Sequence, residues 1–380
     1  MSKKLVDIVN FNADASCYSS AKWIEDLEGG KDSKFCRWLK LYTINNKKIS
    51  LGLIGATIAD IKYFNPEAIE LINNNQDIFE IILRPWSHDI GIYRNNETFV
   101  YNVQKGIAII ENEFENISRY FLSPEFMINS KQIELLKQFD IKAIFINPNR
   151  YDGQIASRLS TVPYEVVSTN GTKMNCISIN GISAKSFLKS MQLYDKNIWN
   201  NSIESIEENI FYSWRDGESS FLLPDSISRE EFWLGYESED IKRVFLNDIE
   251  IKYVKTDELK KNLYKTYPIH SFLAWAQEMK MMWYIDTVSV IEKSFERLSC
   301  FEKAVFLQLI NSDILASVEK KSPIIDIVIE KNLTKFTIYR EEKGFEGEEY
   351  LSILENKKTN STHEFLKKFQ ARRNYFEREF

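Results

Sequence analysis

Apolar runs and helical patterns alternate along the first 190 residues. Short apolar runs bounded by turn residues predict strands at Leu5–Phe11, Ile49–Ile54, Phe79–Leu83, Tyr120–Leu122, Ile141–Ile146, Met174–Ile179 and Ile210–Tyr212. Between them, apolar residues at helical spacing predict helices at Ser20–Asp26, Pro66–Asn74, Phe99–Glu115 and Ser130–Phe139. Strands that alternate with helices at this spacing indicate an α/β fold with a mostly parallel sheet, open or closed.

The rhythm changes in the second half of the chain. Val244–Val254 predicts one more strand, and residues 267 to about 319 have a helical, aromatic-rich pattern. Residues 324–339 alternate like β structure, and residues 362–380 predict a charged terminal helix. We therefore expect two domains, a barrel-like catalytic domain over residues 1–255 and a mainly helical domain over residues 256–380 with a short β segment.

Composition is that of a globular protein. The chain has 380 residues, of which 44% are hydrophobic and 13% aromatic, so it can bury a full barrel core and still form a second domain. A net charge of −6 without a long basic block argues against nucleic acid as a partner. The composition says nothing about the oligomeric state.

Several other classes of protein lack sequence support. No apolar run is long enough to span a membrane and no signal peptide is visible, so we expect no membrane contact and a cytoplasmic location. The four cysteines form no CxxC pair, which disfavours a disulfide framework or a zinc site. Neither a Gly-x-Gly-x-x-Gly nor a Walker A sequence occurs, so we expect no cofactor of either kind.

Glu125 is the first candidate for chemistry. It follows the apolar run Tyr120–Leu122, which the pair Ser123-Pro124 ends, and a helix is predicted soon after it. α/β barrels build their active sites from residues at the C-terminal ends of the strands. The alternative is a carboxylate near the N-terminus of the next helix, where the helix dipole favours negative charge.

A second acidic pair, Asp216 and Glu218, follows another apolar run. Gly217 between the two acids is expected to let the chain turn. Trp214 offers a face for stacking on a sugar ring, and Arg215 is placed to lower the pKa of a neighbouring acid. The alternative is a polar surface turn. Two carboxylates delivered by two strand ends are typical of a glycosidase.

Polar residues alternate at the end of the first strand. Asn10, Asn12, Asp14 and Ser16 occupy every second position, so we expect their side chains to face one way. Buried polar groups need hydrogen-bond partners, which the hydroxyls of a sugar would supply. The alternative is a polar cluster where the strand becomes a loop.

Taken in order, these segments resemble glycoside hydrolase family 57, the retaining α-glucan hydrolases and transferases. The resemblance implies an incomplete (β/α)7 barrel followed by a mainly helical domain. Phe121-Leu-Ser-Pro-Glu-Phe is similar to the strand-4 motif of the family, which implies that Glu125 is the nucleophile. Trp214-Arg-Asp-Gly-Glu is similar to the strand-7 motif, which implies that Asp216 is the general acid/base.

Two further segments carry the resemblance and imply substrate-side residues. Arg84-Pro-Trp-Ser-His-Asp, with Trp86 and His88, resembles the region between the second and third strands. Leu307-Gln-Leu-Ile-Asn-Ser-Asp resembles a signature of the helical domain and points to Ser312 and Asp313.

The first strand departs from the family pattern. Asn10 and Asn12 stand where family members carry histidines, which implies an altered subsite for the reacting sugar. Two alternatives follow. Related polysaccharide deacetylases hold a metal with one Asp and two His; Asp14 and His88 would be two of these, but Ile92 stands near the place of the third. The other alternative is a degenerate barrel that binds carbohydrate without turnover.

The sequence therefore predicts a retaining glycosidase or transglycosidase that acts on an α-linked oligo- or polysaccharide, without a metal or cofactor. Glu125 and Asp216 are the predicted catalytic residues, with Asp248 as the alternative acid if Asp216 points outward. The predicted substrate-binding residues are Asn10, Asn12, Asp14, Trp86, His88, Trp214, Glu218 and Asp313.

Overall fold

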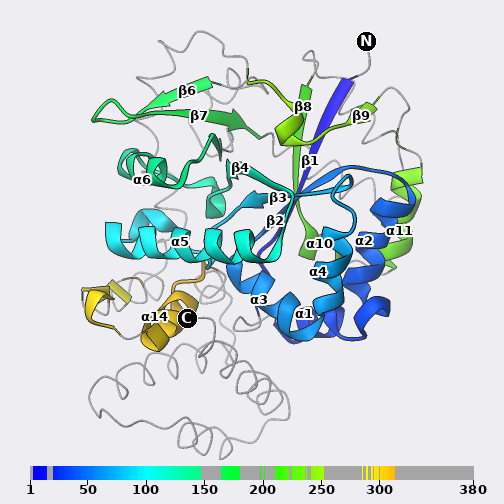
Figure 1. Ribbon diagram of the computed structural model, residues 1–380, viewed down its shortest axis with the longest axis horizontal. Coiled ribbons are helices and arrows are strands. Elements are labelled where there is room, and N and C mark those ends of the chain that lie inside the picture. Colours follow the sequence, from blue (N-terminus) through cyan, green and yellow to red (C-terminus); the bar gives the residue numbers. More distant parts are fainter. Residues whose placement is uncertain are drawn as a thin grey trace, which may run out of the picture.

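The computed structural model of the chain has a central, mainly parallel sheet with helices on its outer side (Figure 1). The structure describes residues 3–14, 20–146, 164–179, 197, 201, 210–221, 225–235, 237, 241–251, 285, 288–289, 292–293, 295–298 and 300–312. The predicted boundary near residue 255, and Ser16 and Asp313, lie outside the described residues.

Among the described strands, all but β6 run parallel, and seven of them pair in the order β7-β5-β4-β3-β2-β1-β8. Their bounds are Lys3–Phe11 (β1), Ile49–Leu53 (β2), Phe79–Leu83 (β3), Ile117–Phe121 (β4), Ala143–Ile146 (β5), Lys173–Ser178 (β7) and Ile210–Asp216 (β8). Within the described residues no pairing joins β7 to β8. The fold confirms the predicted incomplete (β/α)7 barrel.

Two short strands extend the sheet. β6 (Tyr164–Val167) pairs antiparallel with β7, and β9 (Ile241–Arg243) pairs with the start of β1. The predicted strand Val244–Val254 is wrong over residues 244–251, because a short 3-10 helix begins at Leu246. Residues 252–254 lie outside the described residues. The backbone N–H groups of Leu246 and Asn247 donate to the buried Glu80 carboxylate, each at 3.0 Å, instead of to a neighbouring strand. This segment therefore closes the N-terminal end of the barrel.

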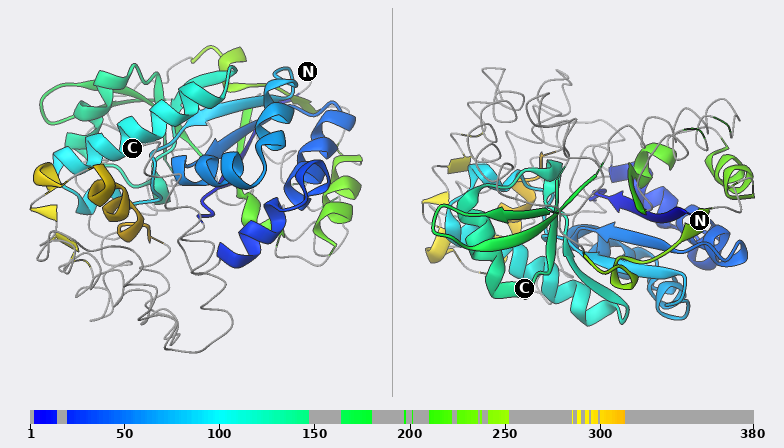
Figure 2. Two further views of the ribbon diagram at one scale, coloured as in Figure 1. Left: turned by 60° about the horizontal axis from the view of Figure 1, so that its bottom comes forward. Right: turned by 90° about the horizontal axis from the view of Figure 1, so that it is seen from above.

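The helices lie around the outside of the strands (Figure 2). Their bounds are Ser20–Leu27 (α1), Lys34–Ile44 (α2), Gly55–Phe64 (α3), Pro66–Asn73 (α4), Asn96–Glu113 (α5), Ser130–Leu136 (α6), Gly217–Phe221 (α10), Ser226–Gly235 (α11) and Cys300–Leu309 (α14). None of the described helices is long and apolar enough to cross a membrane.

Helices α2 and α3 had no counterpart in the predicted elements. In α3, the residues from Gly55 to Ile61 are all buried, so this part of the helix has no polar face to produce an amphipathic pattern. Helix α2 has a recognisable start, since Ser33 is a typical N-cap residue. Its side chain accepts a hydrogen bond from the Cys36 N–H at 3.1 Å.

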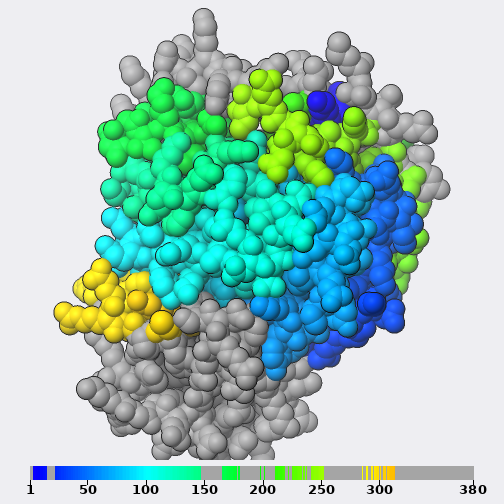
Figure 3. Space-filling model, in the orientation of Figure 1, coloured from blue at the N-terminus to red at the C-terminus, as the bar shows by residue number. Residues whose placement is uncertain are grey.

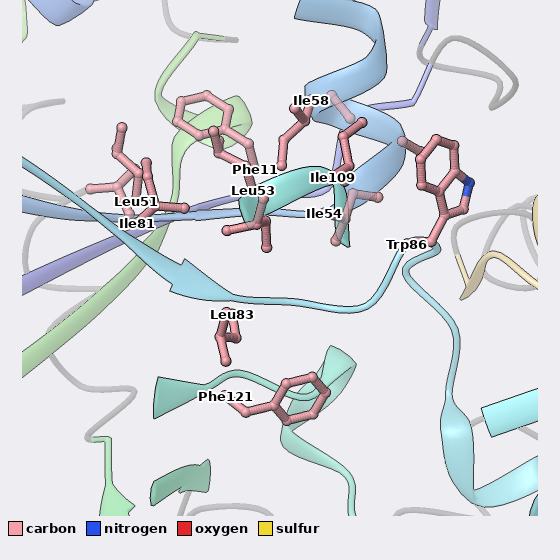
Figure 4. Packing of buried hydrophobic residues seen from close by; sticks show 14 of the residues in the cluster. Phe11, Leu51, Leu53, Ile54, Ile58, Ile81, Leu83, Trp86, Ile109 and Phe121 are labelled. Atoms are coloured by element: carbon pink, nitrogen blue, oxygen red, sulfur yellow. The ribbon is translucent and has the colours of Figure 1, made fainter. Parts of the chain in front are cut away.

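Apolar side chains form two layers of core, one outside and one inside the barrel. Figure 4 shows the outer layer, where Phe11, Leu51 and Leu53 of the strands lie beside Ile58 of α3 and Ile109 of α5. The inner layer is made by Val6, Ile8, Ile82, Tyr120, Leu122, Phe145, Ile177 and Tyr212. Because side chains alternate along each strand, the next inward positions toward the C-terminal ends of the strands hold the candidate residues.

Part of the second half of the chain packs on the barrel. In the space-filling view the residues of α14, in yellow, adjoin those of α5, in cyan (Figure 3). Tyr101 of α5 and Phe295 meet edge to face, with ring centroids 5.4 Å apart, and Phe295 also contacts Phe306 of α14. Helix α14 confirms part of the helical pattern predicted after residue 267.

Candidate active site

The inward face of β1 and β8 becomes polar at the C-terminal end of both strands. Asn10 of β1 lies directly opposite Asp216 of β8 in the parallel register. The Asn10 amide Nδ2 donates to Asp216 Oδ1 at 3.4 Å and to Asn12 Oδ1 at 2.8 Å. The two asparagines thus face one way, as predicted, and Asn10 lies beside the candidate acid.

Arg84 is the cation of this site, and the sequence reasoning did not select it. It directly follows β3, two positions after the inward-facing Ile82, and is only 1% exposed. Its Nη2 donates to Asn12 Oδ1 at 2.9 Å. The sequence does contain a signal for Arg84. Side chains alternate along a strand, so residue 84 faces the same side as the inward-facing Ile82.

Three carboxylates interact electrostatically with Arg84. Burial lowers the pKa of the Arg84 guanidinium to about 9, and the charges of Asp216, Glu218 and Glu125 oppose this effect. Arg84 is therefore still a cation at neutral pH. The charges of acids that follow two different strands, β4 and β8, thus act on one buried cation.

Glu125 lies in a tight turn after β4. It belongs to the short 3-10 helix Pro124–Phe126, and its φ of 53° is in the left-handed region, as is the φ of 56° at Phe126. Non-glycine residues in this region cost about 1 kcal/mol or more each, and such positions cluster at functional sites. The turn is held by the Ser123 hydroxyl, which donates to Met127 O at 2.5 Å.

The helix-capping alternative for Glu125 finds no support in this geometry. Helix α6 begins at Ser130, and its cap is Asn129, whose side chain accepts from the Gln132 N–H at 2.9 Å. The Gln132 side chain in turn accepts from the Asn129 N–H at 3.0 Å, which completes a capping box.

Asp216 is the last residue of β8 and is half-buried. Burial raises the pKa of its carboxyl group above the ordinary range, while the hydrogen bond from Asn10 and the charge of Arg84 act in the opposite direction. A carboxylic acid that stays protonated to higher pH suits the role of a general acid.

The neighbours of Asp216 differ from expectation in two respects. Arg215 faces away from the site and pairs with Glu230 of α11 at 2.7 Å, so it does not lower the pKa of Asp216. Gly217 is needed for close packing, because a Cβ at this position would lie 2.2 Å from the Phe11 ring. Glu218 is half-buried and accepts a hydrogen bond from the Asn12 N–H.

The two predicted tryptophans lie in different places. Trp214 is half-buried on the inward face, where its ring meets Phe126. Trp86 is 3% exposed and belongs to the outer core, so its placement does not bring it into the site. Gly55 and Gly106 make room for its segment, since a Cβ at either residue would lie within 3.0 Å of Trp86 atoms.

His88 is buried and joined to the second half of the chain. Its Nδ1 lies 2.8 Å from the Ser312 hydroxyl, and its carbonyl accepts from the Ser312 N–H at 2.8 Å. Burial and the charge of Arg84 hold the pKa of His88 well below its ordinary range, so the imidazole is neutral. Ser312, which the resemblance pointed to, therefore lies against the β3 loop, next to the undescribed Asp313.

The deacetylase alternative gains nothing from the placement of its residues. Asp14 follows β1 by three residues and is 1% exposed. In the part of the chain that the structure describes, no group of three or more His, Cys, Asp or Glu side chains could hold a metal ion.

Asp248, the alternative acid, lies at the wrong end of the barrel. It is in the segment that closes the N-terminal end, its side chain is 48% exposed, and it pairs with Lys48 at 3.2 Å. Asn247 beside it donates to Ile117 O, at the first residue of β4.

A parallel barrel that presents acids at the C-terminal ends of different strands has the architecture of a glycosidase. The chain belongs to glycosyl hydrolase family 57, whose family model matches residues 19–218, more than half of its length. No curated protein sequence matches the chain significantly.

Solved structures of the family share its fold. The chain is similar to a 4-alpha-glucanotransferase from Thermococcus litoralis (TM-score 0.57, 9% identity), covering 88% of this chain and 55% of that one. It is also similar to a branching enzyme from Thermococcus kodakaraensis (TM-score 0.57, 9% identity), covering 100% and 96%. An alpha-amylase from Thermotoga maritima matches at the same TM-score and identity, covering 93% and 96%. At such identities these likenesses concern the fold alone.

Proposed function

We propose that the chain is a retaining glycoside hydrolase or transglycosidase that acts on an α-linked oligo- or polysaccharide. Family membership supports the class, and the names of the structural neighbours favour an α-glucan as the substrate. The observation that supports the assignment of residues is the contact across the barrel interior between Phe126, which follows Glu125, and Trp214, which lies two residues before Asp216. The charges of both acids also act on the buried Arg84.

In this proposal Glu125 attacks the anomeric carbon, and a covalent glycosyl-enzyme forms. Asp216 protonates the departing glycosidic oxygen, for which its raised pKa is suited. In the second half-reaction Asp216 takes a proton from water or from an acceptor sugar, which then attacks the anomeric carbon and releases Glu125. A retaining pair requires the two carboxyl groups to be roughly 5–5.5 Å apart in the reacting complex.

Mass spectrometry of the products from a panel of glycans tests the proposal. We expect the wild type to shorten or rearrange α-linked glucans such as maltopentaose, and Glu125→Gln to lose about a thousandfold or more of this activity. Glu70→Gln, a change of an exposed glutamate on α4, is the matched control. Full activity of Glu125→Gln would contradict the assignment, and glycan binding without turnover by the wild type would favour the degenerate barrel.

A further inference from the structure

Arg215, which directly precedes Asp216 in β8, is anchored on the outer side of the barrel. Side chains alternate along a strand, so Arg215 points outward where Asp216 points inward. Arg215 Nη2 donates to Glu230 Oε1 of α11 at 2.7 Å and to the Tyr42 hydroxyl of α2. The Tyr42 hydroxyl donates in turn to the same Glu230 oxygen, and the three residues are at most 2% exposed. This anchor joins the end of β8 to two helices that lie side by side (Figure 1).

The end of β8 has one strand neighbour among the described residues, since β8 pairs with β1 alone. Within the same residues the Asp216 side chain accepts one hydrogen bond, from Asn10 at 3.4 Å, which is longer than the usual range of roughly 2.7–3.2 Å. The place of the Asp216 carboxyl group therefore depends mainly on the backbone at the end of β8. Arg215 is the adjoining residue of that backbone.

The anchor is electrostatically strong. Burial alone would lower the pKa of Arg215, but the charge of Glu230 and the other negative partners outweigh it and raise the pKa, so Arg215 is a cation. Pulling one member out of a buried ion pair is strongly unfavourable, because an uncompensated charge stays behind. Arg215 therefore holds the end of β8 in one position against α2 and α11.

We propose that Arg215 is a positioning residue for the general acid: its anchor on Glu230 and Tyr42 fixes the end of β8 so that the Asp216 carboxyl group reaches the departing oxygen. This inference rests on the proposed function and gives residues outside the barrel interior a part in the reaction. A displacement of a reacting group by about 1 Å can cost about a hundredfold in rate. Loss of the anchor should therefore impair proton donation by Asp216 more than attack by Glu125.

The test compares two substrates that differ in their need for a proton. The sugar that leaves maltopentaose must be protonated, whereas the fluoride of α-maltosyl fluoride departs without a proton donor. We expect Arg215→Met to lose about tenfold to a hundredfold in kcat/KM with maltopentaose, and less than about threefold with the fluoride. In the Asp216→Asn background Arg215→Met should cost less than about threefold more on maltopentaose, because the proton donor is already absent. A merely structural role would lower both substrates by the same factor, and that result would overturn the inference.

Glu230→Gln is the milder second variant, and it decides the question if Arg215→Met does not fold. It removes the negative charge of the anchor but keeps an oxygen that accepts from Arg215. We expect a loss of about threefold to tenfold on maltopentaose alone, because the hydrogen bond to an ionised acceptor is replaced by a weaker neutral one. A ratio of the two kcat/KM values equal to that of the wild type would contradict the positioning role.

The matched controls are Arg243→Met and Glu237→Gln. Arg243 is also a buried arginine in ion pairs, with Glu237 at 3.0 Å and Asp7 at 2.9 Å, but it lies beside Leu5 near the start of β1. The controls should lose stability in thermal unfolding without changing the ratio of kcat/KM between the two substrates. A change of this ratio as large as that of Arg215→Met would show that the effect is not specific to the end of β8.

Asp216→Asn by itself separates failure of this inference from failure of the proposed function. If Asp216→Asn depends on the substrate as expected and the variants of Arg215 and Glu230 do not, only the positioning role is overturned. If Asp216→Asn loses equally on both substrates, or the wild type cleaves neither, the proposed function fails and the positioning role fails with it.

Discussion

Phe126 and Trp214 meet edge to face inside the barrel, with ring centroids 5.0 Å apart and planes at 78°. Phe126 follows Glu125 directly, and Trp214 lies two residues before Asp216 on the same face of β8. Their strands are separated by β3, β2 and β1 in the sheet, so the contact crosses the barrel interior. It links the turn that carries one candidate carboxylate to the strand that carries the other.

Asp216→Asn should reduce kcat/KM about a hundredfold to ten-thousandfold, because the departing oxygen loses its proton donor. Substrates whose leaving group needs no proton should be affected much less. Steady-state kinetics with maltopentaose and with an activated aryl glycoside measure both effects. Asp32→Asn, at an exposed aspartate, is the control. An equal loss on both substrates would contradict the role of general acid.

Arg84→Met should move the alkaline limb of the pH profile of kcat/KM to higher pH. The charge of Arg84 favours the ionised form of Asp216 and therefore lowers its pKa. Without this charge the pKa of Asp216 rises, and the protonated acid persists to higher pH. The measurement is kcat/KM of the variant as a function of pH. Arg37→Met, at an exposed arginine on α2, is the control. A limb that stays in place or moves to lower pH would refute the coupling.

Much of the fold follows from the sequence because each parallel strand is a short apolar run between helices. The strand Phe79–Leu83 was predicted with the bounds that the structure has. Helix α3 was missed because its buried residues carry no periodic polar face. The strand predicted at Val244 was wrong because Glu80, distant in sequence, takes up the backbone N–H groups of that segment.

Asp7→Asn should destabilise the protein by about 3 to 5 kcal/mol, the usual cost of breaking a buried ion pair. Asp7 is 1% exposed; its carboxylate pairs with Arg243 at 2.9 Å and accepts from the Ser213 hydroxyl at 2.5 Å. Urea unfolding at neutral pH measures the change in the free energy of unfolding. Asp77→Asn, at an exposed aspartate, should change it by less than about 0.5 kcal/mol.

The same pair predicts a pH dependence of stability. Burial would raise the pKa of Asp7, but Arg243 and Arg215 outweigh it and hold the pKa below the ordinary value of 3.8. The contribution of the ionised group is therefore full above pH 3.8 and is lost as the pH falls through the lowered folded-state value. The gap in stability between wild type and Asp7→Asn should be constant at neutral pH and narrow only in strong acid. A gap that widens on acidification would contradict this.

Asp248→Asn should leave kcat/KM within about twofold of the wild type, because Asp248 lies at the N-terminal end of the barrel beside Lys48. Steady-state kinetics with maltopentaose measure kcat/KM of both proteins. A loss comparable to that of Asp216→Asn would show that the catalytic acid has been assigned to the wrong residue.

Only part of the candidate site could be predicted from the sequence. Acids at strand ends are visible as polar residues after apolar runs, and this selected Glu125 and Asp216. The place of Arg84 depends on which face of β3 turns inward, and Trp86 was selected although it packs in the outer core. The contact between Asn10 and Asp216 depends on the register between β1 and β8, which no local pattern specifies.

The assignment of Glu125 as the nucleophile is tested most directly by trapping the covalent intermediate. A 5-fluoroglycosyl fluoride of the α-glucose type forms a glycosyl-enzyme that hydrolyses slowly, and peptide mass spectrometry locates the attached sugar. We expect one sugar per chain, attached to Glu125, and none on Glu125→Gln. A sugar attached to any other carboxylate, or labelling of Glu125→Gln equal to the wild type, would contradict the account.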